Sequence, residues 1–182
     1  MIRCFIAIPC SKPVADNLAG AQMGIQALGA VKGVEPGNMH LTLKFLGEQD
    51  ETLVDKARLA LESVEHPGFR MEVRGLGAFP DIARPKVIWA GIGAGGKETA
   101  ELSATVDAAL KPLGYQPENR FHPHITLARV KGHVNPLKLS QTIEASRQTI
   151  YGSYDAAEFT LMESRLTPAG PKYSTLKSYP LQ

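Results

Sequence analysis

Cysteine is scarce in this sequence, and long apolar runs are absent. The 182 residues include two cysteines, Cys4 and Cys10, which are too few for a disulfide framework or a cysteine-based metal site. No apolar run approaches the ~20 residues of a membrane span, and the apolar start of the chain lacks the full h-region and cleavage site of a signal peptide. We therefore expect a cytoplasmic protein with free thiols and no membrane contact.

A strong net charge is missing as well. The 20 basic and 18 acidic residues leave a net charge of +2, which gives no support for the basic stripes expected of duplex-binding proteins. A local site for one or a few phosphates remains compatible with this balance. The apolar fraction of 43% and the charged fraction of 21% are typical of a globular protein.

A His-x-Thr pattern occurs twice in the chain, at residues 40–42 and 124–126. The two copies lie nearly half the chain length apart, and polar and apolar residues alternate in both. One copy alone is weak, because chance produces such a tripeptide in an appreciable minority of chains. Two copies at matching places predict one site built from two related halves.

Apolar periodicity predicts a similar order of elements around each copy. Each half contains a helix, the motif strand and a second helix, and a Gly-rich link at residues 91–96 separates the halves. Glycine-rich segments at 29–37 and 75–80 are predicted to be loops. The predicted strands are 3–8, 39–46, 69–73, 87–91, 124–130, 159–166 and 172–181, and the predicted helices begin near residues 13, 51, 97 and 136.

This order predicts an α+β fold in which residues 1–182 form a single bilobal domain. The fold would be pseudo-duplicated, with two antiparallel sheets flanking a central cleft and helices on their outer faces. The two motif strands would then face each other across the cleft.

The repeated motif carries groups suited to acid–base chemistry. Residues i and i+2 of a strand share a face, so His40 lies beside Thr42 and His124 beside Thr126. Imidazole titrates near pH ~6.5, so one ring can accept a proton while its partner donates one, and either ring can take either role. Threonine hydroxyls can donate to non-bridging oxygens, and Arg129 adds a cation suited to phosphate. This set matches a phosphodiester and needs no metal or other cofactor.

Several neighbouring residues have competing interpretations. His122 and His124 could suggest a metal site, but no acidic or cysteine ligand lies near them at a familiar spacing. Lys44 falls on the predicted face of the first motif, where it could be solvated or could contact substrate. We predict that Phe5 and Trp89 belong to the core rather than to a base-stacking surface.

At these residues the sequence resembles the 2H phosphoesterase superfamily, which is named for two such histidine motifs. Within it, the sequence is similar to the RNA 2′,3′-cyclic phosphodiesterases, also called the 2′-5′ RNA ligase family. A tryptophan that many relatives carry before the first motif is missing from residues 30–36. The segments that carry the resemblance are 3–8, 38–47, 75–80, 121–129, 163–166 and 170–173.

The resemblance implies metal-independent hydrolysis of a 2′,3′-cyclic phosphate to a 2′-phosphate. It assigns His124 as the proton acceptor that activates water and His40 as the proton donor to the departing 3′ oxygen. Thr42, Thr126 and Arg129 would hold the phosphate. The implied partners are RNA ends that carry a cyclic phosphate, or small cyclic nucleotides, and nothing in the sequence demands more than a monomer.

Two other functions are compatible with the same residues. A 2′-5′ RNA ligase would run the reverse transesterification in the same fold. A non-enzymatic RNA-binding module would only grip a terminal phosphate, although binding alone needs cations more than titratable rings.

Overall fold

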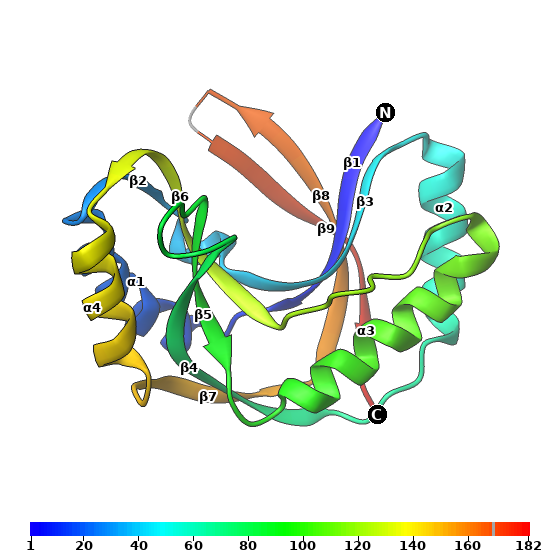
Figure 1. Cartoon of the computed structure of the whole chain (residues 1–182). Helices are drawn as coiled ribbons and strands as arrows, with labels where there is room; N and C mark the ends of the chain where they lie inside the picture. Colours follow the sequence, from blue (N-terminus) through cyan, green and yellow to red (C-terminus); the bar gives the residue numbers. More distant parts are fainter. Residues whose placement is uncertain (169) are drawn as a thin grey trace.

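A computed structural model of the chain describes residues 1–168 and 170–182, and the helices and strands of these residues are labelled in Figure 1. Within the described ranges, no helix is long and apolar enough to cross a membrane. The helices are α1 (Lys12–Gln26), α2 (Glu51–Ala60), α3 (Gly96–Leu110) and α4 (Pro136–Ser146). The strands are β1 (Ile2–Pro9), β2 (Gly29–Gly33), β3 (His40–Gln49), β4 (Phe69–Phe79), β5 (Val87–Ile92), β6 (His124–Val134), β7 (Ile150–Ala156), β8 (Glu158–Thr167) and β9 (Gly170–Pro180).

The strands form one antiparallel sheet in the order β7-β4-β5-β6-β3-β1-β8-β9, and β2 pairs with β6 beside this path. The motif strands β3 and β6 share a single pair of residues, Leu41 and Ile125. This joining pair divides the sheet into a first lobe (β3, β1, β8, β9) and a second lobe (β6, β5, β4, β7, β2). The predicted α+β class is confirmed, and the two predicted sheets are linked through the joining pair.

Two helices pack against the lobe that does not contain the strand preceding them in the chain. Helix α1 follows β1 of the first lobe but packs against β6 and β7 of the second. Helix α3 follows β5 of the second lobe but packs against β3 of the first, and Figure 1 shows α1 with α4 on one side of the molecule and α2 with α3 on the other. Strand β4, which precedes the Gly-rich link, also belongs to the second lobe. The predicted boundary at residues 91–96 therefore separates related sequences but does not separate the lobes.

Both glycine-rich segments that were predicted as loops contain strand. Strand β2 lies in the first of them, and a Cβ at Gly29 would lie 2.3 Å from the backbone of β6. The second segment continues β4, where Gly75 has a φ of +67° and lies at a register shift. A Cβ at Gly77 would lie 2.2 Å from the ring of Trp89. These glycines therefore allow close approach and a bulge, rather than forming the predicted turns.

The ends of several elements follow the predictions closely. The Asp50 carboxylate caps α2 as expected, because it accepts a hydrogen bond from the Leu53 amide at 2.7 Å. The final strand pair is also present as β8 and β9, although its predicted turn at residues 168–171 includes Ala169, which lies outside the described residues. Strand β7 was not predicted, because glycine, serine and aspartate interrupt its apolar pattern. Its strand conformation is stabilised by pairing with β4.

The crossing of α1 predicts a large stability difference between two positions on that helix. Leu18 is fully buried, whereas the side chain of Met23 is 72% exposed. We expect Leu18→Ala to lower the free energy of unfolding by about 2–5 kcal/mol, and Met23→Ala to change it by less than about 0.5 kcal/mol. Urea unfolding of both variants measures the difference.

The same experiment tests whether the lobes unfold together. Circular dichroism reports both lobes, whereas the fluorescence of Trp89, the one tryptophan in the sequence, reports the second lobe. Because each lobe is covered by a helix from the other half, we expect the two signals to give one coincident transition. Two separated transitions would contradict this interlocking.

Candidate active site

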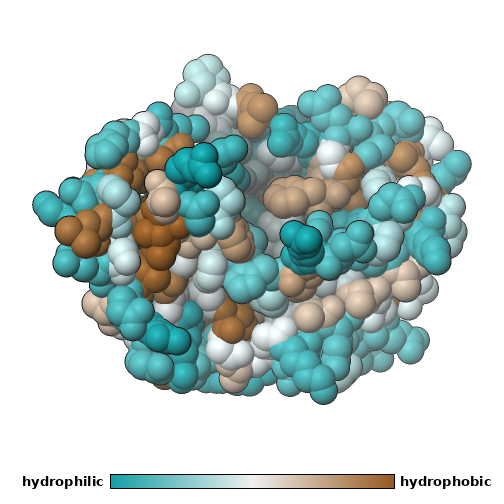
Figure 2. Space-filling model, in the orientation of Figure 1, coloured by the Kyte–Doolittle hydropathy of each residue, from teal (hydrophilic) through white to brown (hydrophobic). Residues whose placement is uncertain are grey.

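The two motif histidines are the first residues of β3 and β6, next to the joining pair. Continuing the antiparallel register by one residue from that pair sets His40 opposite Thr126 and Thr42 opposite His124. All four side chains are half-buried. The surface of the molecule is hollowed between the lobes (Figure 2). The structure therefore brings the two predicted histidine–threonine pairs together across a local two-fold relation.

Each histidine ring is held in the same way, by a backbone carbonyl of the residues that precede its strand. Nδ1 of His40 lies 2.7 Å from the carbonyl oxygen of Asn38, and Nδ1 of His124 lies 2.7 Å from the carbonyl oxygen of His122. A carbonyl oxygen only accepts hydrogen bonds, so Nδ1 is the donor in both rings. In the neutral tautomer this leaves Nε2 of both rings with a lone pair, ready to accept a proton.

Burial lowers the pKa of both rings below the ordinary value of 6.5. For His40, the bond to Asn38 opposes this effect, and the positive charges of Arg129 and His124 add to it. For His124, the bond to the His122 carbonyl opposes burial, and the charge of His122 adds to it. Both rings therefore favour the neutral state in the free protein, and Arg129 and His124 both lie close enough to His40 for their charges to affect it.

A β-bulge follows the threonine in each motif strand. In β3, Thr42 pairs with Ala7 and Lys44 pairs with Ile6, so Leu43 is an extra residue. In β6, Thr126 pairs with Trp89 and Ala128 pairs with Ile88, so Leu127 is the extra residue at the corresponding place. An extra residue reverses the faces of all the side chains that follow it.

The bulges decide which side chains join the site. Beyond them, Phe45 and Arg129 return to the face of the motif residues, and both side chains are exposed. Regular alternation from Thr126 would have placed Arg129 on the opposite face. The face that lines the cleft therefore carries all five predicted site residues: His40, Thr42, His124, Thr126 and Arg129.

Lys44 lies on the opposite face, so its predicted position beside the first motif is wrong. Its side chain is buried, forms an ion pair with Asp107 of α3, and donates a hydrogen bond to the carbonyl of Gln116 at 2.7 Å. Asp107 also accepts a hydrogen bond from the amide of Glu118 at 2.7 Å. The bulge at Leu43 causes this change of face. Lys44 therefore links β3 to α3 and to the segment before the second motif through its ion pair and hydrogen bond.

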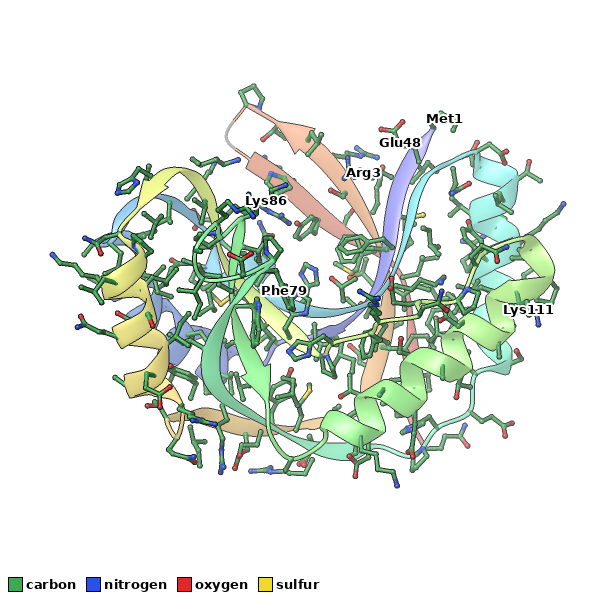
Figure 3. All side chains as sticks on the ribbon, viewed as in Figure 1. Met1, Arg3, Glu48, Phe79, Lys86 and Lys111 are labelled. Carbon is green, nitrogen blue, oxygen red and sulfur yellow. The ribbon has the colours of Figure 1, made fainter. Side chains whose placement is uncertain are left out.

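Aromatic rings surround each histidine. The ring of Phe5 stacks on His40 at a centroid distance of 4.7 Å, and Tyr173 presents its edge to His40 at 5.3 Å. Around His124, Phe79 presents its edge at 5.0 Å. Phe79 points from β4 toward the middle of the molecule (Figure 3). These rings exclude water from one side of each imidazole, which explains the desolvation that lowers the two pKa values.

Tyr173 and Phe79 were not identified as site residues from the sequence. They are distant from both motifs along the chain, and their only sequence signal is that they lie in the segments 170–173 and 75–80 that carry the family resemblance. Phe5 is buried as predicted, whereas Trp89 is half-buried and its ring lies 6.1 Å from that of His124.

Among the described residues, no group of three or more histidine, cysteine, aspartate or glutamate side chains is placed to hold a metal ion. The arrangement instead offers two imidazoles, two hydroxyls and one guanidinium on a single face. Imidazoles transfer protons, whereas hydroxyl and guanidinium groups donate hydrogen bonds to anionic oxygens. The chemistry available at this site is therefore proton transfer beside a bound anion.

Known proteins are similar to this chain in sequence. A sequence model described as LigT-like phosphoesterase matches residues 8–89 and 93–173. The RNA 2′,3′-cyclic phosphodiesterase of Aeropyrum pernix is 40% identical over 147 residues, which cover 80% of this chain and 84% of that protein. The RNA 2′,3′-cyclic phosphodiesterase of Methanocaldococcus jannaschii is 34% identical over 98% of this chain and 100% of that protein.

Solved structures share the fold. The protein TT0787 of Thermus thermophilus superposes with a TM-score of 0.84 at 28% identity, covering 99% of this chain and 98% of that chain. Escherichia coli LigT, in its complex with 3′-AMP, superposes with a TM-score of 0.80 at 26% identity and the same coverage. The resemblance inferred from the two motifs is confirmed, and the chain belongs to the LigT-like phosphoesterase family of the 2H phosphoesterase superfamily.

Proposed function

We propose that this chain hydrolyses 2′,3′-cyclic phosphates, at RNA ends or in nucleotides, to 2′-phosphomonoesters. The observation that carries the proposal is the matched pair of histidines, each bound through Nδ1 to a backbone carbonyl beside the joined motif strands. Displacement at phosphorus needs one group to remove a proton and another to supply one. The names of the relatives, RNA 2′,3′-cyclic phosphodiesterases, support this substrate.

In the proposed reaction, Nε2 of His124 takes a proton from water as the water oxygen bonds to phosphorus. The bond between phosphorus and the 3′ oxygen breaks, and protonated Nε2 of His40 gives its proton to that oxygen. The products are a 2′-phosphomonoester and a free 3′-hydroxyl. This division of roles follows the family resemblance. Every proton is carried by a side chain of the protein, so the proposed reaction is independent of metal.

The groups around the histidines would hold the phosphate. Thr42, Thr126 and Arg129 would donate hydrogen bonds to the non-bridging oxygens, where negative charge grows in the transition state. Phe45 lies on the same face, and its ring is 70% exposed. Stacking of a base on an aromatic ring contributes about 1–3 kcal/mol, so this ring favours a nucleoside-bearing substrate over a simple phosphodiester.

RNA halves distinguish hydrolysis from the two alternative functions. One half carries a 2′,3′-cyclic phosphate and the other a free 5′-hydroxyl. We expect 2′-phosphate to form in excess over joined RNA, because water greatly outnumbers 5′-hydroxyl groups. Joined product with little 2′-phosphate would favour the 2′-5′ ligase, and tight binding of the RNA without turnover would favour the binding module.

Removing each histidine tests the two roles. We expect His40→Ala and His124→Ala each to lower kcat by about a hundredfold or more, the usual contribution of general acid–base catalysis. The residual activity of His40→Ala should lose the alkaline limb of its pH profile, and that of His124→Ala should lose the acidic limb. The matched control is His133→Ala, because His133 is an exposed histidine of the same strand as His124.

Other results for these variants would change the interpretation. Exchanged limbs would reverse the two roles. Wild-type turnover in both variants would contradict the two-histidine mechanism. Wild-type turnover in His133→Ala is expected, and a large loss there would show that the other losses are not specific to the motif.

The lowered pKa values predict a difference between two pH profiles of the wild-type protein. The profile of kcat/KM reports the free enzyme, and that of kcat reports the enzyme–substrate complex. Burial lowers the pKa of His40 in the free protein, so the alkaline limb of kcat/KM should fall below pH 6.5. The negative phosphate should raise that pKa in the complex, which moves the alkaline limb of kcat to higher pH. Coincident alkaline limbs, both above pH 6.5, would contradict this expectation.

A further inference from the structure

Gln22 contacts the bulge of the second motif strand from the far side of the sheet. It lies on α1, and its side chain is buried with 8% exposure. Its Nε2 donates one hydrogen bond to the carbonyl of Leu127 at 2.7 Å and another to the carbonyl of Val34 at 2.8 Å. Leu127 is the extra residue of the β6 bulge. A side chain of the crossing helix therefore holds the backbone at the point where β6 departs from regular pairing.

The carbonyl of Leu127 has two donors at this point. The amide of Val34 donates to it at 2.8 Å, beside the Gln22 amide. Leu127 has no residue opposite it on β5, because Thr126 pairs with Trp89 and Ala128 pairs with Ile88. Buried carbonyls require hydrogen-bond partners, so these two donors stabilise the bulged conformation.

Arg129 depends on this bulge for its position. It pairs with Val87 after the register shift and returns to the face that carries His124 and Thr126. Without the extra residue, its side chain would lie on the face covered by α1. Gln22 therefore binds the backbone carbonyl of Leu127, only two residues before Arg129.

The first motif strand contains the same device. The hydroxyl of Ser103 donates a hydrogen bond to the carbonyl of Leu43 at 3.1 Å, and Leu43 is the extra residue of the β3 bulge. Ser103 lies on α3, the other helix that crosses between the lobes. In both halves, a polar side chain of the crossing helix therefore binds the carbonyl of the bulge.

Gly33 provides space for the Gln22 amide. A Cβ at Gly33 would lie 2.6 Å from both Cδ and Oε1 of Gln22 and 2.5 Å from Nε2 of Gln26. These distances are too short for any side chain larger than hydrogen. Substitution of Gly33 would therefore displace the amide without altering Gln22 itself.

We propose that Gln22 is a positioning residue that acts through Arg129: it holds the β6 bulge and so directs the guanidinium into the site, where it binds a phosphate. The role in turnover rests on the proposed function, but the role in phosphate binding does not. It is tested by the affinity for inorganic phosphate, measured by calorimetry or by the fluorescence of Trp89.

We expect Gln22→Met to weaken phosphate binding about tenfold. The displaced Arg129 would lose a hydrogen bond to the charged phosphate, and the loss of such a bond typically has an effect of this size. Gly33→Ala should have a similar effect and serves as the second variant if Gln22→Met does not fold. Gln26→Met is the matched control, because Gln26 lies one turn further along α1 and is exposed. It should bind phosphate as the wild type does.

A double-mutant cycle separates positioning from general destabilisation. Arg129→Met alone should weaken phosphate binding about tenfold, and adding Gln22→Met to it should cause no further loss. A tenfold loss that persists in the Arg129→Met background would overturn the proposal, as would wild-type affinity in both Gln22→Met and Gly33→Ala. A protein that shows the expected cycle but does not hydrolyse a cyclic phosphate would contradict the proposed function and leave the positioning role in place.

Discussion

Two β-bulges, at Leu43 and Leu127, determine which side chains reach the cleft. Side chains of a regular strand alternate between faces, so one extra residue reverses every position beyond it. Because the bulges follow Thr42 and Thr126, the motif residues are unaffected, whereas Phe45 and Arg129 are brought back to their face. The crossing helices bind both bulge carbonyls, so the assembly of the lobes and the composition of the site are coupled.

The site is symmetric where the proposed reaction would transfer protons and asymmetric where a substrate would be held. The two halves keep a histidine and a threonine at equivalent positions, and both rings bind a backbone carbonyl two residues earlier in the chain. Beyond the bulges, the first half has Phe45 and the second has Arg129. A nucleoside cyclic phosphate has the same asymmetry, because its anionic group is attached to an uncharged nucleoside whose base can stack on an aromatic ring.

Local pattern in the sequence predicted the parts of the site that precede the bulges. The alternation at residues 40–42 and 124–126 was enough to place the four motif side chains on one face. It failed at Lys44, because the register shift depends on pairing with β1 and on a carbonyl bound by α3. The prediction of Arg129 rests on its chemistry alone, because regular alternation places its side chain on the opposite face. Tyr173 and Phe79 approach the histidines only through tertiary folding, which local periodicity does not encode.

The most direct test is the product formed from a 2′,3′-cyclic nucleotide in ¹⁸O-labelled water with excess chelator. We predict a 2′-phosphate that carries one labelled oxygen, formed at the same rate as without chelator. This result requires direct attack by water at phosphorus, departure of the 3′ oxygen and no metal. A 3′-phosphate product would contradict departure of the 3′ oxygen, and turnover abolished by chelator and restored by a divalent cation would contradict a metal-independent mechanism with two histidines.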